Sequence, residues 1–275
     1  MIVTPKWLYD RLGEVIVLDA RFDLFDEKKG KQAYHAEHLP GALFIDMAEE
    51  MADKRIQGAG RHPLPSPEDM AQMFAKKGIS KDSKVVIYDD QNGGIAAARA
   101  WWMLEFLGNN NAAILDGGIQ AWKNSGYPTT DEVKLPDEAQ FEPHVKEGWL
   151  VSAEQVKNKL GSAVLVDSRS RERYQGEQEP LDPKAGHIPG ALNFPWSGVL
   201  RQDGNWKSTE ELVQHFAALP RDQEVIVYCG SGISACPNVL ALKRAGFKQV
   251  TLYAGSWSDW SSRNGYPVET GQSSQ

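Results

Sequence analysis

The chain contains two similar halves, and this duplication constrains the fold more than any other feature of the sequence. The words VLDAR, HLPGA, VVIYD, LDGGIQAW and SGYP occur in this order in the first half. The second half contains LVDSR, HIPGA, VIVYC, LYAGSWSDW and NGYP, again in this order. Chance does not give five ordered matches, so the sequence predicts two domains of the same fold. The length of 275 residues suits two domains, each with a core of its own.

Each half alternates short β-branched runs with longer amphipathic stretches. The runs at Val15–Leu18 and Val225–Tyr228 are typical of buried parallel strands, because parallel sheets are covered on both faces. Helices are predicted at Pro67–Lys77, Ile95–Leu107, Ser208–Ala218 and Ile233–Ala245. The alternation predicts an α/β fold in which each domain has a mainly parallel sheet flanked by helices. We place the domains at residues 1–130 and 149–275, with a polar linker at 131–148.

Composition argues against several classes of function. A formal net charge of −7 at pH 7 argues against a nucleic-acid partner. No apolar run is long enough to span a bilayer and residues 1–11 lack a signal-peptide pattern, so we expect no membrane partner and a cytoplasmic location. The two cysteines are too few for a disulfide scaffold, and the six histidines show no spacing typical of metal ligands. A metal site is therefore not expected.

Residues that both halves share are interpreted as parts of the scaffold, whereas a residue found in only one half is a candidate for chemistry. The shared polar and aromatic residues are the pairs Asp19 and Asp167, Arg21 and Arg169, His38 and His187, and Trp122 and Trp260. We interpret them as hydrogen-bonded anchors and packing residues.

The sharpest difference between the halves follows a predicted strand, where Asp89 in the first half corresponds to Cys229 in the second. Cys229 ends the strand and is followed by a glycine-rich loop and a predicted helix. Inward-facing amides and the positive end of a helix favour anions, so this thiol should ionise readily. Because the thiolate is the nucleophilic form of cysteine, Cys229 is the candidate nucleophile. Cys236 lies within the predicted helix and is interpreted as a packing residue.

The words HLPGA and HIPGA, the sequence YCGSGISA and the tryptophan-rich ending resemble the tandem-domain rhodanese-like sulfurtransferases. The likeness covers nearly the whole chain. It implies two tandem rhodanese-like domains, of which the N-terminal one, with Asp89 at the cysteine position, is inactive. It also implies that Cys229 is catalytic and heads a loop of six residues, which continues with Gly230, Ser231, Gly232, Ile233 and Ser234.

The family mechanism that the resemblance implies is a transfer of sulfur in two stages. The cysteine thiolate takes a sulfur atom from a small anionic donor, holds it as a persulfide, and passes it to a thiol or cyanide acceptor. Thioredoxin is one candidate for the thiol acceptor. No cofactor is implied.

The surroundings of the cysteine indicate the donor. The CGSG loop resembles that of the 3-mercaptopyruvate enzymes, whereas members that prefer thiosulfate carry a basic CRKG loop, so 3-mercaptopyruvate is favoured and thiosulfate comes next. Arg173 in RSRERYQG matches the carboxylate-binding arginine of the family, and a guanidinium can hold a carboxylate in a bidentate pair. The second arginine typical of mercaptopyruvate enzymes is replaced here by Leu181, and Lys184 is the candidate substitute.

Two residues of the first half resemble groups that the family brings toward the serine of the loop. They are Asp46 in FIDM and His62 in RHPLP. His62 has no histidine counterpart in the second half, which favours a functional role. Either residue could equally stabilise a turn.

Two other functions are compatible with the fold. A phosphatase of the Cys-x5-Arg type needs an arginine at position 235, where this chain has Ala235, so a phosphate would lack its charged clamp. A non-catalytic binding or regulatory module is the second alternative, because the fold alone does not imply catalysis. The presence of both Cys229 and Arg173 favours the enzyme.

Overall fold

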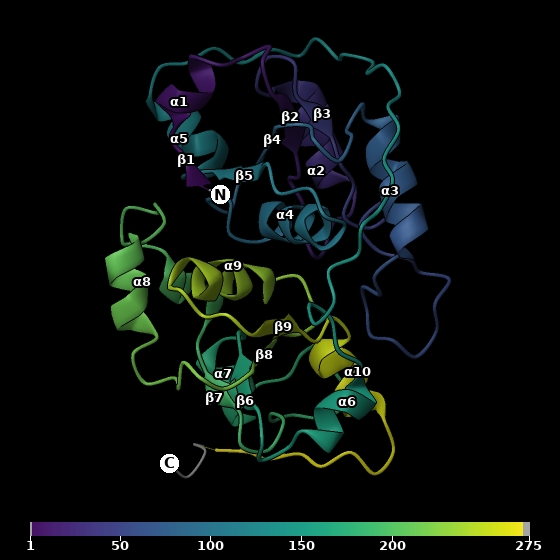
Figure 1. The fold of residues 1–275 in the computed structure, drawn as a ribbon, viewed down its shortest axis with the longest axis vertical. Coiled ribbons are helices and arrows are strands. Elements are labelled where there is room, and N and C mark those ends of the chain that lie inside the picture. The colour runs from purple at the N-terminus through teal and green to yellow at the C-terminus, as the bar shows by residue number, and fades with distance from the viewer. Residues whose placement is uncertain (1, 272–275) are drawn as a thin grey trace. The chain divides into compact units, whose positions relative to one another are not determined.

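The computed structural model describes residues 2–271, and the chain divides into two compact units (Figure 1). Unit 1 contains the chain up to Asp53, Leu64–Lys146 and Gln202–Trp206. Unit 2 contains Lys54–Pro63, Glu147–Arg201 and the chain from Lys207. Each unit therefore includes a short segment from the other half of the sequence, and both segments follow the HxPGA motif of their half. The repeat alone did not predict this exchange.

Unit 1 is built on a sheet of five parallel strands in the order β1-β5-β4-β2-β3. The strands are β1 (Ile2–Val3), β2 (Ile16–Asp19), β3 (Leu43–Phe44), β4 (Val85–Tyr88) and β5 (Ala112–Leu115). The helices are α1 (Pro5–Tyr9), α2 (Lys29–Ala36), α3 (Pro67–Lys76), α4 (Ala96–Phe106) and α5 (Gly118–Asn124). One face of the sheet packs against α1 and α5 through Leu8, Val86 and Trp122, whereas α4 contacts β4 and β5.

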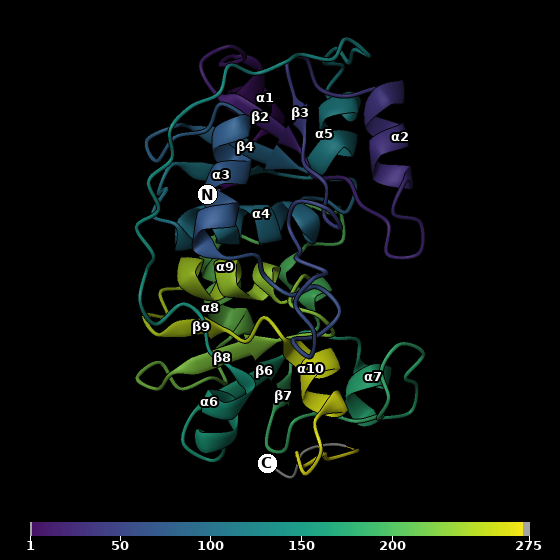
Figure 2. The ribbon, with the colours of Figure 1, turned by 90° about the vertical axis from the view of Figure 1, so that its right-hand side faces the viewer.

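Unit 2 repeats this plan with four parallel strands in the order β7-β6-β8-β9. The strands are β6 (Val164–Asp167), β7 (Leu192–Asn193), β8 (Val225–Tyr228) and β9 (Val250–Leu252). The helices are α6 (Ala153–Asn158), α7 (Arg171–Gln175), α8 (Thr209–His215), α9 (Cys236–Arg244) and α10 (Ser256–Ser262), with a short 3-10 helix at Trp196–Val199. Figure 2 shows α8 and α9 on one side of this sheet and α6 and α10 on the other. Side chains of β8 therefore alternate between two buried layers, and its end delivers Cys229 to the edge of the sheet.

The polar residues shared by the halves make the same contacts in both units. Arg21 donates hydrogen bonds to Asp19, and Arg169 donates hydrogen bonds to Asp167. The shortest bond of each pair measures 2.6 Å. The Nδ1 atoms of His38 and His187 each lie 2.7 Å from a backbone carbonyl oxygen, of Tyr34 and Tyr174 respectively. These bonds confirm the prediction that the shared residues anchor the scaffold.

All four predicted helices occur within three residues of their predicted ends, and the largest differences are the end of α8 at His215 and the start of α9. This helix begins at Cys236 rather than at Ile233, because Gly232 adopts a positive φ of 78° and the next residues form a turn. Pro237 suits the first turn of the helix, where its missing N–H is not needed. None of the helices described in residues 2–271 is long and apolar enough to cross a membrane.

Candidate active site

Cys229 follows β8 directly, and its side chain contacts polar groups of the loop after it. The residue is only 1% exposed. Its Sγ atom accepts a hydrogen bond from the backbone N–H of Gly232 at 3.2 Å. A Cβ atom at Gly232 would lie 2.3 Å from the carbonyl oxygen of Ala254, so the positive φ and the close approach both require glycine here. The sulfur is buried, but it is held against a backbone amide.

Ser256, the first residue of α10, supports Cys229 from a strained backbone position. Its φ is 55°, a left-handed value that a residue with a Cβ atom rarely adopts. The Ser256 Oγ atom accepts from the backbone N–H of Cys229 at 3.1 Å and lies 3.9 Å from its sulfur. The equivalent residue of unit 1 is Gly118, with a φ of 57°. Sequence reasoning missed Ser256, although a serine where the other half has glycine was an available signal.

The segment 54–63 brings His62 to the serine of the loop within unit 2. The Nδ1 atom of His62 lies 2.9 Å from the Oγ atom of Ser231, and Ser231 is 6% exposed. The backbone N–H of Arg61 donates to the Oγ atom of Ser258 in α10 at 3.0 Å, which fixes the segment beside the loop. Ile233 is buried in the same loop, and Ser234 is partly exposed.

Arg173 and Arg61 both reach the loop next to Cys229. A Cβ atom at Gly230 would lie 3.0 Å from Nη2 of Arg61 and 3.2 Å from Nη1 of Arg173. Arg61 was not among the residues predicted from the sequence. It precedes His62 in the RHPLP motif, and only the exchange of segments reveals where it lies.

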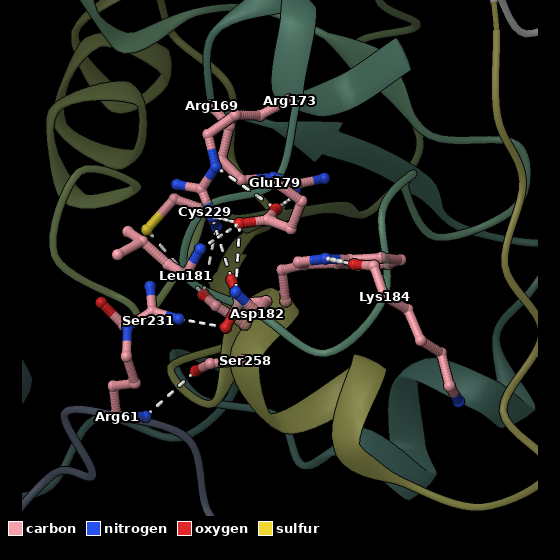
Figure 3. A network of polar contacts seen from close by, with 12 residues as sticks. Arg61, Arg169, Arg173, Glu179, Leu181, Asp182, Lys184, Cys229, Ser231 and Ser258 are labelled. Atoms are coloured by element: carbon pink, nitrogen blue, oxygen red, sulfur yellow. Dashed lines mark hydrogen bonds and ion pairs between the residues drawn. The ribbon is translucent and has the colours of Figure 1, made fainter. Parts of the chain in front are cut away.

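Both guanidinium groups are paired with a buried carboxylate, as the converging dashed lines in Figure 3 show. Asp182 forms ion pairs with Arg61 and, at 2.9 Å, with Arg173. Burial raises the pKa of the Asp182 carboxyl above its ordinary value, while the charge of Arg61 acts in the opposite direction. Glu179 binds Arg173 at 2.7 Å and also the fully buried Arg169 at 3.1 Å.

Two other residues named from the sequence have their own partners. Lys184 points away from Cys229 in Figure 3, and its Nζ atom donates to the carbonyl oxygen of Arg263 at 3.3 Å. Asp46 belongs to unit 1, where its Oδ1 atom accepts from the backbone N–H groups of Ala48 and Glu49 at 2.9 and 3.2 Å. This is the turn-stabilising role that the sequence left open.

The loop of unit 1 that corresponds to Cys229–Ser234 binds a carboxylate of its own chain. Asp89 is 1% exposed, and its two oxygens accept four backbone N–H groups at distances of 2.7 to 3.2 Å. The donors are Gln91, Gly93, Ile95 and Ala97. Burial raises the pKa of Asp89, and the four amides oppose that effect. A loop of this shape therefore offers several amides to one anionic group.

Residues 4–125 and 152–263 each match the model of the Rhodanese-like domain. The chain belongs to the rhodanese-like family. It is 41% identical over 279 residues to the probable 3-mercaptopyruvate sulfurtransferase of Pseudomonas aeruginosa, and the match covers 98% of both chains. It is also 37% identical over 283 residues to the thiosulfate sulfurtransferase of Bos taurus, covering 98% of this chain and 94% of the relative.

The rhodanese-like fold is equally clear from solved structures. The structure of SseA from Escherichia coli, a 3-mercaptopyruvate sulfotransferase, superimposes with a TM-score of 0.83 and 32% identity. The superposition covers 94% of this chain and 98% of SseA. These findings confirm the predicted family, the two tandem rhodanese-like domains and the enzyme class: the chain is a sulfurtransferase.

Proposed function

We propose that this rhodanese-like enzyme moves a sulfane sulfur from a small anionic donor to a thiol or cyanide through a persulfide on Cys229. We favour 3-mercaptopyruvate as donor, with thiosulfate next. The observation that carries the proposal is the hydrogen bond of 3.2 Å from the Gly232 amide to the Cys229 sulfur, at the end of a buried parallel strand. An amide directed at the sulfur can stabilise negative charge on the atom that attacks the donor.

The first half-reaction is a displacement at the sulfur of the donor. With 3-mercaptopyruvate, the Cys229 thiolate forms an S–S bond and the C–S bond of the donor breaks, leaving its electron pair on the enolate of pyruvate. The proton of the donor thiol is lost and the enolate carbon gains one, so the products are pyruvate and an anionic persulfide. With thiosulfate the S–S bond of the donor breaks and sulfite leaves. The acceptor then takes the outer sulfur and restores the thiolate.

The carboxylate of Asp89 supports the second part of the proposal, the stabilisation of the persulfide. An aspartate side chain and a cysteine persulfide both extend an anionic atom beyond the β position into the loop. The amides that bind Asp89 belong to the unit 1 loop that corresponds to the loop after Cys229 in unit 2. We therefore assign the backbone amides from Ser231 to Ala235, that of Gly232 included, to the charge of the outer sulfur.

Side chains beside the loop suit the two other requirements of the reaction, which are proton transfer and binding of the donor. The pair His62 and Ser231, joined at 2.9 Å, is placed to carry the proton that leaves the donor thiol toward the enolate carbon. Arg61 and Arg173 supply the positive charge for the carboxylate or sulfonate part of the donor. We propose the cytoplasm as the location and include thioredoxin among the thiol acceptors.

Steady-state kinetics with cyanide as acceptor test the proposal. The enzyme should release pyruvate and thiocyanate from 3-mercaptopyruvate, with parallel lines in double-reciprocal plots because the donor product leaves before the acceptor reacts. The same assay with thiosulfate should give a lower kcat/KM. No thiocyanate from either donor would contradict catalysis and leave a binding module as the function.

A further inference from the structure

The groups around the donor site form a closed cluster of charges. Arg61, Arg173 and Arg169 face Asp182, Glu179 and Asp167, so three guanidinium groups meet three carboxylates. The cluster therefore carries no net charge, although the proposed donors are anions. This balance is unexpected for a site that must attract a carboxylate or thiosulfate.

The carboxylates differ in what they bind. Glu179 accepts from the buried Arg169 and from the backbone N–H groups of Leu181 and Asp182, both at 3.2 Å, so it belongs to the scaffold of its own turn. The Asp182 carboxylate instead bridges Arg61 and Arg173. Both arginines approach Gly230, because a Cβ atom placed there would lie 3.0 Å from Nη2 of Arg61 and 3.2 Å from Nη1 of Arg173. Asp182 thus occupies the groups that an incoming anion would use.

One N–H group of these two arginines lacks an acceptor in the part of the chain that the structure describes. Among the residues that the structure describes, the buried Nε atom of Arg61 has no hydrogen-bond partner. A buried N–H group without an acceptor costs free energy, and an oxygen atom of a bound anion would satisfy it. Arg61 is therefore only partly satisfied by its ion pair with Asp182.

We propose that Asp182 sets the affinity of this enzyme for anionic donors, because it competes with the donor for Arg61 and Arg173. The inference rests on the proposed function of the Cys229 loop. Asp182 makes the site selective, since a weak or singly bonded anion does not displace a buried carboxylate that bridges two guanidinium groups. A donor that offers two oxygens can replace it in the same bridging geometry, with one oxygen on each guanidinium group.

The test measures the binding of inert anions and the kinetics of donors for the variant Asp182→Asn. Asparagine keeps the shape of the side chain and removes its charge. Isothermal titration calorimetry with sulfate and with pyruvate should give dissociation constants about tenfold lower for the variant than for the wild type. This factor corresponds to about 1.4 kcal/mol of binding free energy. The effect should be larger for sulfate, which carries two charges. KM for 3-mercaptopyruvate should fall by a similar factor, with little change in kcat.

The matched control is Glu172→Gln, which removes one charge from an exposed side chain of α7. It should leave the dissociation constants within about twofold of the wild type, because exposed charges are screened. Arg61→Gln, made alone, should weaken the binding of both anions. Asp182→Ser is made beside Asp182→Asn as a second variant without the charge, and thermal unfolding of each variant checks that the fold is kept.

Unchanged or weaker anion binding in both folded Asp182 variants would overturn the inference. Equal tightening by the Glu172→Gln control would overturn it as well, since the effect would then be one of net charge. The binding measurement does not need turnover. If both Asp182 variants bind anions more tightly but the wild type makes no persulfide, the role of Asp182 stands and the proposed function fails.

Discussion

The Nδ1 atom of His62 lies 2.9 Å from the Oγ atom of Ser231, although 169 positions separate the two residues in the sequence. The contact exists because residues 54–63 belong to unit 2, while the chain on either side of them belongs to unit 1. The reciprocal segment ends in Trp206, whose indole N–H donates to the carbonyl oxygen of Asn92 in the unit 1 loop at 3.2 Å. Each loop is thus contacted by a segment from the other half of the sequence, and only one of these segments carries an imidazole.

Ser231→Ala and His62→Gln should each lower kcat for 3-mercaptopyruvate about 10- to 100-fold, because proton transfer by positioned groups contributes at least that much. The loss with thiosulfate should be small, since sulfite leaves without taking a proton. The double variant should lose little more than either single variant, because the two side chains act as a pair. Steady-state kinetics with both donors measure this. Equal losses for both donors would assign the pair to loop structure.

Arg173→Lys should raise KM for both anionic donors by about 10- to 100-fold, which corresponds to the roughly 1.5–3 kcal/mol of hydrogen bonds to a charged group. Lysine keeps the charge but loses the fork that reaches Glu179, Asp182 and the donor. Arg171→Lys, on the exposed side of α7, is the matched control and should leave KM unchanged. A fall in kcat with an unchanged KM would contradict donor binding by Arg173.

Ser256→Ala and Ser256→Gly should separate strain from hydrogen bonding. Both variants remove the hydroxyl that accepts from the Cys229 amide and approaches its sulfur. Only glycine relieves the positive φ of 55°, so the glycine variant should be more stable than the alanine variant by about 1 kcal/mol. Urea unfolding measures the difference. Both variants should lose sulfur-transfer activity equally, and higher activity in either one than in the wild type would contradict a supporting role for the hydroxyl.

His215 should make the stability of the enzyme depend on pH. Its burial, and next the charge of Lys207, lower the pKa of His215 to about 4, and its Nε2 atom has no partner among the described residues. The unfolded chain takes up a proton below pH about 6.5, whereas the folded chain does so only near 4. The free energy of unfolding should therefore fall by about 1–2 kcal/mol as the pH drops from 7 to 4.5, after an allowance for the partial exposure of His215.

The variant His215→Gln has no charge to gain and should lose less stability over this range. Urea unfolding at the two pH values compares it with the wild type. An identical pH dependence in both proteins would assign the effect to other groups.

The sequence repeat was sufficient to predict the two parallel sheets, the shared anchors and Cys229 at the end of β8. It was sufficient because periodic burial and a duplicated motif order are local properties of the sequence. The positions of Arg61, Ser256 and Asp182 were not predicted. Arg61 reaches the loop only because residues 54–63 belong to unit 2. Ser256 contacts Cys229 from a left-handed backbone conformation that serine rarely adopts. The role of Asp182 depends on its ion pairs with Arg61 and Arg173, which the sequence does not reveal. The start of α9 was misplaced because Gly232 delays the helix.

The most direct test of the persulfide on Cys229 is the intact mass of the reduced enzyme after incubation with 3-mercaptopyruvate and removal of the donor. The wild type should gain the mass of one sulfur atom and lose it again when cyanide is added. Cys229→Ser, whose hydroxyl ionises far less readily than a thiol, should gain nothing while keeping the unfolding temperature of the wild type. Cys236→Ser should gain the sulfur normally. A wild type that stays unmodified, or a Cys229→Ser variant that still gains sulfur, would contradict the account.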